Sequence, residues 1–193
     1  VSVQVTANTG KVYTNTTGTV SSTNGGTGLT ATDTLTVVSP AVISKSFSPT
    51  AINDGGISTL TFTVTNPSTN PVPLTGVSFN DVFPTGLEVN DPANVLITNC
   101  GSTPSCSPAP GATTVSLADA TIAAGTPCVL SVDVTASAGV YENTSEVVNS
   151  NEGGEGLPSN TATLNVLATL DLVISKSDGI ASVTAGDAVT YTI

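Results

Sequence analysis

The 193-residue chain contains no histidine, arginine, methionine or tryptophan, and Lys11, Lys45 and Lys176 are its only basic residues. A nucleophile elbow and a Gly-rich phosphate loop are also missing, so the usual parts of a catalytic site are absent and we expect no enzyme. The 14 acidic residues give a formal net charge of -11. Such a charge repels nucleic-acid backbones and anionic membrane surfaces, which excludes nucleic acid as a partner.

Long apolar runs are missing as well. No stretch approaches the roughly 20 apolar residues that a membrane-spanning helix needs, so we expect no membrane insertion in this segment. Nothing at the N-terminus resembles a signal peptide, but we expect the chain to begin within a module, where none would be found. The Ser/Thr/Asn-rich, lysine-poor composition favours an extracellular or cell-surface location.

What the chain does contain favours strands. Apolar residues make up 38% of the sequence, and they are mostly Val, Ala, Leu and Ile, with 18 glycines between them. This composition suits thin sheet-on-sheet cores better than one large core, so we expect an all-β protein made of several small sandwiches.

Three cysteines, Cys100, Cys106 and Cys128, lie close together in the sequence. We expect one disulfide and one free thiol, and favour Cys100 with Cys128, since these residues close one predicted strand and open another. A zinc site is the alternative, although the chain has no histidine and "CGSTPSC" lacks the CxxC spacing.

The sequence repeats itself. Residues 1–46 and 130–177 are two copies of one segment, in which Val3 corresponds to Val132, Tyr13 to Tyr141 and Lys45 to Lys176, at offsets of 128 to 131 residues. This period is that of one β-sandwich module. We therefore predict that 1–39 are the last strands of one module, 40–168 a complete module, and 169–193 the first strands of a third. Each end piece must be completed by further chain or by another molecule.

Alternation and turn residues place about eight strands in the complete module, which indicates an immunoglobulin-like β-sandwich. In "STLTFTVTN", Leu60, Phe62 and Val64 face inward. "YENTSEVVN" and "NTATLNV" supply the last two strands.

Three polar residues fall on inward faces of these strands. They are Lys45 in "AVISKSFSP", Asp81 in "VSFNDVF" and Asn160 in "NTATLNV". With the lysine neutral and the aspartic acid protonated by burial, the amine can attack the Asn carboxamide and release ammonia, leaving an intramolecular isopeptide bond. The alternative is that Lys45 pairs with a carboxylate and Asn160 binds a turn.

The segments "VISKS", "GVSFNDVFPTGL" and "AGDAVTYTI" resemble the tandem repeats of bacterial and archaeal surface proteins known as the eleventh domain of unknown function. They are also similar to Cna-B-type modules of adhesins and pilins. The resemblance implies Ig-like stalks, some of which carry a Lys-to-Asn cross-link assisted by an acid, as Lys45, Asp81 and Asn160 would be. The preceding repeat has Ala31 in place of Asn160, so not every module would form this bond.

Two further kinds of site are open. Calcium is a possible cofactor, since acidic residues lie near turns, although no DxDxDG-type loop is present and loop carboxylates are usually solvated. These residues are Asp54, Glu152, Glu155, Asp171 and Asp178. Asn15 and Asn143 lie in equivalent sequons of the repeat, which makes both candidates for glycosylation.

Near-copies of one segment at a fixed offset suit a spacer or polymer. We therefore expect a non-catalytic structural module of an extracellular fibre, stalk or surface protein, whose partners are neighbouring modules or copies of itself. The alternative is an adhesin module that binds a ligand through a pocket or an exposed apolar patch.

Overall fold

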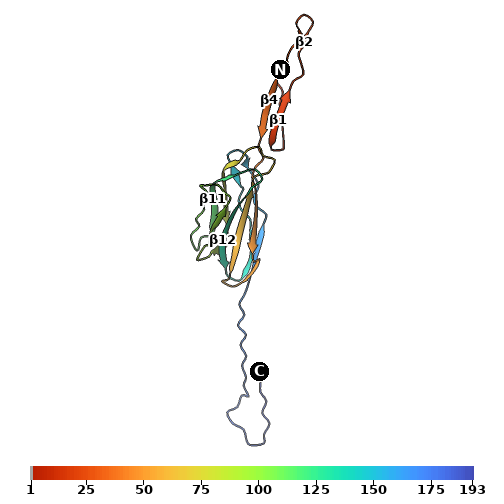
Figure 1. Cartoon of the computed structure of the whole chain (residues 1–193). Helices are drawn as coiled ribbons and strands as arrows, with labels where there is room; N and C mark the ends of the chain where they lie inside the picture. Colours follow the sequence, from red (N-terminus) through yellow and green to blue (C-terminus); the bar gives the residue numbers. More distant parts are fainter. Residues whose placement is uncertain (1) are drawn as a thin grey trace.

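The computed structural model describes residues 2–193 and contains only strands, turns and loops in this range. A β-sandwich occupies the middle of the chain, as Figure 1 shows, and its strands run along the long axis of the molecule. A hairpin leaves one end of the sandwich and residues 168–193 leave the opposite end. The prediction of an all-β sandwich fold is confirmed.

The first layer of the sandwich is a sheet in the order β10-β12-β7-β5, with β9 also paired to β12. All of its pairings are antiparallel. Its strands are β5 (Val42–Ser48), β7 (Ile57–Thr65), β9 (Leu87–Val89), β10 (Leu96–Thr98) and β12 (Pro127–Ala136). Because β5 lies at the end of this order, one side of its main chain has no strand beside it.

The second layer contains the sheet β11-β8-β14-β15, beside which lies the small sheet β13-β16-β6. The main chain joins the two, because the Glu146 amide, three residues after the end of β13, donates a hydrogen bond to the Asn80 carbonyl of β8. The strands are β6 (Ala51–Asn53), β8 (Leu74–Val82), β11 (Thr114–Ile122), β13 (Gly139–Asn143), β14 (Asn149–Ser150), β15 (Gly154–Glu155) and β16 (Ala162–Leu167). The segment "YENTSEVVN", expected as one strand, is therefore divided between β13 and β14.

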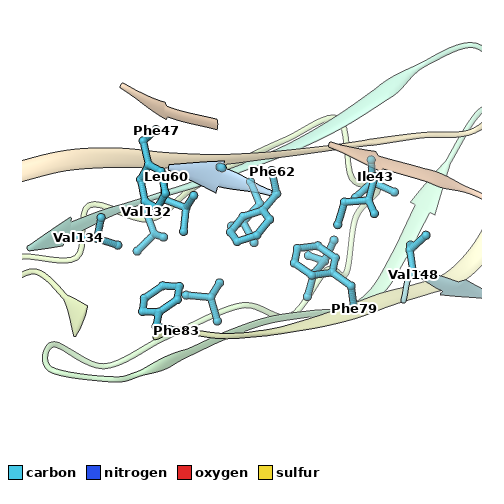
Figure 2. Packing of buried hydrophobic residues seen from close by; sticks show 14 of the residues in the cluster. Ile43, Phe47, Leu60, Phe62, Phe79, Phe83, Val132, Val134 and Val148 are labelled. Atoms are coloured by element: carbon cyan, nitrogen blue, oxygen red, sulfur yellow. The ribbon is translucent and has the colours of Figure 1, made fainter. Parts of the chain in front are cut away.

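The core lies between the two layers and is built by alternation along the strands. Figure 2 shows Ile43, Leu60 and Phe62 pointing toward Phe79 and Phe83 of the opposite layer. The Phe62 and Phe79 rings lie 4.9 Å apart between centroids, tilted by 41°. The interior is thus lined by aliphatic and aromatic side chains, and a polar side chain placed there needs a hydrogen-bond partner.

The N-terminal hairpin pairs β1 (Lys11–Thr16) with β4 (Thr32–Val37), and its tip pairs β2 (Ser21–Ser22) with β3 (Gly26–Thr27). Its local hydrogen bonds are the same as those in the copy of the repeat at residues 130–177. Tyr13 Oη donates to the carbonyl of Thr9, and Tyr141 Oη donates to that of Ser137, in both cases four residues earlier. The Gly25 amide donates to Ser22 Oγ, and the Gly153 amide to Ser150 Oγ, in the corresponding turns.

Candidate functional site

Lys45 is the centre of a polar cluster inside the sandwich. Its side chain lies on the inner face of β5 between Ile43 and Phe47, and the residue is 4% exposed. The Nζ atom lies 2.5 Å from Asp81 Oδ1 and 5.1 Å from the centroid of the Phe62 ring. The predicted inward register of Lys45 is therefore seen in the structure, and its amine is surrounded by apolar groups and one carboxyl.

Asp81 approaches this amine from the opposite layer. It follows Val77 and Phe79 on the inner face of β8 and has no exposed surface. Burial raises the pKa of the Asp81 carboxyl, against the lowering effects of Lys45 and of the nearby Asn143 amide. Burial likewise lowers the pKa of the Lys45 amine, against the effect of Asp81. Both shifts favour the uncharged forms of the pair.

Asn143, predicted from the sequence only as a glycosylation site, is a third buried polar residue near Asp81. Asn143 ends β13 on the same inner face as Tyr141 and is 3% exposed. Its Nδ2 donates to the carbonyl of Val82, the residue after Asp81, over 3.0 Å. Glycosylation of Asn143, predicted from the sequon, stays a prediction, and in the folded chain the amide nitrogen that would carry the glycan is buried and bonded to Val82.

Two oxygens of this cluster remain without a hydrogen-bond partner among residues 2–193. They are Oδ2 of Asp81 and Oδ1 of Asn143, both buried. Buried oxygens of this kind are usually paired, because an unpaired one loses its hydrogen bond to water without replacement. The hydrogen bonding of the cluster is therefore incomplete at both Asp81 and Asn143.

Asn160 does not belong to the cluster, which corrects the predicted trio. Its side chain is exposed and lies before the start of β16 at Ala162. The Asn160 amide binds the main chain of Lys45 instead, accepting from the Lys45 amide and donating to its carbonyl. The predicted alternation holds for Ala162, Leu164 and Val166, but it does not extend back past the strand end.

The structure joins Cys100 and Cys128 in a disulfide, with their Cα atoms 4.6 Å apart, which is the pairing favoured from the sequence. Both residues are buried in the core. Cys106 is a half-buried free thiol, and burial raises its pKa to about 11.

The remaining predicted sites are dispersed. Asn15 is exposed on β1, so its glycosylation stays a prediction. Glu152 accepts hydrogen bonds from Thr75, and Asp54 accepts one from the Ala138 amide. Within residues 2–193, the five acidic residues proposed for calcium, Asp54, Glu152, Glu155, Asp171 and Asp178, do not come together, and no group of three potential metal ligands occurs. The same range holds no helix long and apolar enough to cross a membrane.

Residues 41–166 match the family model described as "Domain of unknown function (DUF7933)". A search of the curated proteins found no match. This match, and not the family suggested by the motif resemblance, is what the comparison supports.

Solved structures similar to the chain include a non-cellulosomal cohesin from Archaeoglobus fulgidus, at 12% identity and a TM-score of 0.47 over 65% of this chain and 91% of that one. The major pilin SpaD from Corynebacterium diphtheriae aligns at 15% identity and a TM-score of 0.48, over 65% of this chain and 34% of the pilin. The pilin subunit BcpA of Bacillus cereus aligns at 11% identity and 0.48, over 81% and 48% of the two chains. At this level of similarity, no ligand, partner or assembly transfers from those proteins to this chain.

Proposed function

Because the chain belongs to the family described as "Domain of unknown function (DUF7933)", which assigns no activity, we propose from its geometry that it is a structural module of an extracellular fibre, stalk or surface protein. The observation that carries this proposal is the placement of the two flanking segments. The hairpin of β1 and β4 leaves one end of the sandwich, and residues 168–193 leave the other (Figure 1). Modules connected in this way lie in a row along the strand direction.

The internal repeat supports the same arrangement. In this proposal, residues 1–39 are the last strands of one module and 169–193 the first strands of another, on either side of 40–168. Lys176 Nζ lies 4.2 Å from the centroid of the Tyr191 ring, as Lys45 Nζ lies near the Phe62 ring. Leu170, Leu172 and Ile174 are at least 80% exposed, which fits a segment that pairs with other strands in an assembled rod.

A fixed joint between consecutive modules also supports a rod. The Asn70 amide accepts from the Ser39 amide over 2.7 Å and donates to the Ser39 carbonyl over 2.9 Å. Ser39 Oγ in turn accepts from the Gly10 amide at the base of the hairpin. These bonds tie the hairpin to the sandwich where the chain crosses between them, so a row of such units would resist bending.

The adhesin alternative has one observation in its favour. A mainly apolar hollow lies where the hairpin meets the sandwich, lined by residues that include Pro40, Val42, Pro67 and Leu157. Val42 and Leu157 are strongly exposed, as expected for a surface that binds an apolar group. A neighbouring module would also cover such a hollow, and the repeat favours this occupant.

Electron microscopy of the purified full-length protein that contains this chain tests the proposal. We expect a thin rod with beads at a regular spacing equal to the length of one sandwich. Globular heads on short stalks would overturn the fibre function in favour of the adhesin. Protease treatment of intact cells tests the location, since a surface protein releases peptides of this chain without lysis and an internal one does not.

A further inference from the structure

Three buried side chains with complementary chemistry converge between the layers of the sandwich. Lys45 supplies an amine, Asp81 a carboxyl and Asn143 a carboxamide, and each residue is less than 5% exposed. The Lys45 amine donates to Asp81 Oδ1, and the Asn143 carboxamide, which donates to the carbonyl of Val82, lies near enough to the same carboxyl to act on its pKa. Water, the usual competitor for an amide carbonyl, is kept out by the surrounding core.

The two unpaired oxygens indicate where a proton belongs. Asp81 Oδ2 and Asn143 Oδ1 are both acceptors when the carboxyl is ionised, so neither can satisfy the other. A single proton on Oδ2 turns this oxygen into a donor, and Asn143 Oδ1 is the other buried oxygen of the cluster that lacks a partner. The raised pKa of Asp81 agrees with this protonation, and Glu146, the other charged group acting on the carboxyl, raises it further. A carbonyl that accepts a hydrogen bond from an acid is polarised toward attack at its carbon.

The internal repeat retains two members of the cluster. Lys45 corresponds to Lys176, and Asn143 corresponds to Asn15, at the same place in "VYTNTT" and "VYENTS". Asn160, in contrast, corresponds to Ala31. The lysine and the asparagine at the end of β13 are therefore features of the repeating unit, whereas the exposed asparagine is particular to one copy.

We propose that Lys45 and Asn143 react with each other in the folded chain to form an intramolecular isopeptide bond, with Asp81 as the proton-transferring acid. The neutral amine of Lys45 attacks Cγ of Asn143, and a new N–C bond forms while Asp81 Oδ2–H stabilises the developing oxyanion. Asp81 then passes one proton from the attacking nitrogen to the departing NH2 group. The C–N bond of the carboxamide breaks, one molecule of ammonia leaves, and Asp81 ends as it began, so no oxidant or cofactor is needed.

The bond would connect the first strand of the sandwich, β5, to β13 in the opposite layer. The chain between the two residues, 46–142, contains most of the core strands. Pulling on the ends of the module would then load a covalent bond between its first strand and one of its last strands. Such a link suits a module in a row of modules, but its formation does not depend on that function.

Intact-mass spectrometry of the 193-residue chain after folding tests the proposal directly. With the disulfide reduced in every sample, we expect the wild-type mass to be lower than the sequence mass by one ammonia. Trypsin provides a second readout, because Lys45 in amide linkage is not cleaved and residues 12–176 then stay in one fragment. Cleavage of this fragment by a Glu-specific protease, at sites that include Glu142 and Glu146, should release a peptide in which residues 143–146 are branched onto Lys45. A wild-type chain at its full sequence mass, cleaved normally after Lys45, would overturn the proposal.

Matched variants separate the two asparagines and test the acid. We expect Asn160→Ala to lose ammonia as the wild type does, and Asn143→Ala to keep its full mass. If Asn143→Ala does not fold, the branched wild-type peptide still decides, since a branch at Asn160 would refute the assignment. Asp81→Asn retains the shape of the side chain without the acid and should remain unlinked. Loss of ammonia by Asp81→Asn as fast as by the wild type would show that Asp81 has no part in the reaction.

Discussion

The side chain of Asn160 forms two hydrogen bonds with the main chain of Lys45, accepting from its amide over 2.9 Å and donating to its carbonyl over 3.0 Å. β5 is the edge strand of its sheet, so these main-chain groups have no neighbouring strand to bind. A carboxamide presents one donor and one acceptor, as a peptide group does, and here it takes the place of the missing strand. The exposed asparagine thus protects the edge of the sandwich.

Asn160→Ala should therefore destabilise the fold by about 1 to 3 kcal/mol, the sum of two hydrogen bonds of ordinary strength. Urea unfolding followed by circular dichroism measures the difference. Asn165→Ala is the matched control, because Asn165 is exposed on β16 and its substitution should change the free energy of unfolding little. Equal effects of the two substitutions would show that the bonds to Lys45 contribute nothing.

Alternation along single strands was enough to predict the fold class and two members of the buried cluster. Lys45 and Asp81 both lie within long strands whose inward positions are otherwise apolar, so their period-two pattern is unambiguous. Asn160 lies two residues before the start of β16 at Ala162, where the chain is not a strand. Side chains there need not alternate between two faces, so the period-two pattern does not predict where Asn160 points.

Asn143 was missed for a different reason. Its residue type and the following Thr144 and Ser145 form a sequon, which suggests an exposed surface, while its burial depends on the position of β13 beside β8. Pairing between distant strands is set by the whole fold and cannot be read from a local pattern. Two features of the sequence agree with the burial of Asn143. It lies two residues after Tyr141, which places both on one face of a strand, and the other copy of the repeat has an asparagine, Asn15, at the same place.

The disulfide between Cys100 and Cys128 should contribute substantially to stability. The two residues are 28 apart in the sequence, and a loop of this size corresponds to about 3 to 4 kcal/mol of lost unfolded-state entropy. Cys128→Ala should therefore lower the free energy of unfolding by about this amount, beyond the loss of packing. Cys106→Ala is the control, and addition of a reductant should destabilise it as much as it destabilises the wild type. An unfolding midpoint that does not respond to reductant would contradict this prediction.

Cys106 should react slowly in the folded protein. Burial raises the pKa of its thiol to about 11, so only a very small fraction is thiolate at neutral pH. The rate of alkylation by iodoacetamide, followed by mass spectrometry, should increase with pH up to about 11 in the native chain. In denaturant without reductant, the same single thiol should react much faster at neutral pH. Equal rates in the folded and unfolded states would contradict the protection by burial.

Glu152 should make stability depend on pH in the acidic range. Burial acts to raise the pKa of its carboxyl, but the hydrogen bonds from Thr75 Oγ1 and the Thr75 amide outweigh burial and hold the pKa below its usual value. Because the folded pKa is the lower one, the stabilisation is complete above the ordinary value of about 4.3 and is lost as the pH falls through the folded pKa.

The melting temperature of Glu152→Gln should accordingly be below that of the wild type at pH 6, and the two should converge below pH 4. The expected difference is small, since the carboxylate is largely solvated and its bonds are screened. Glu155→Gln removes the same charge from the same turn and serves as the control for net charge. A difference between Glu152→Gln and the wild type that persists unchanged to pH 2 would exclude the carboxylate as its source.

The joint between the hairpin and the sandwich should be rigid because of one close approach. Gly10 lies against Asn70 and Ser39, and a Cβ at this position would collide with Asn70 Oδ1 and contact Ser39 Oγ at 2.9 Å. Asn70 cannot move aside without cost, because its Nδ2 also donates to Asn66 Oδ1 over 2.7 Å in the buried interior. Gly10→Ala should therefore break the bonds between Ser39 and Asn70 while the sandwich itself stays folded.

Hydrogen exchange checks this: the Ser39 amide should lose its protection and the Phe62 amide should keep it. Gly18→Ala, with open space around its Cβ, should leave both amides as protected as in the wild type, and protection of Ser39 that survives Gly10→Ala would mean that the hairpin is not held through this contact.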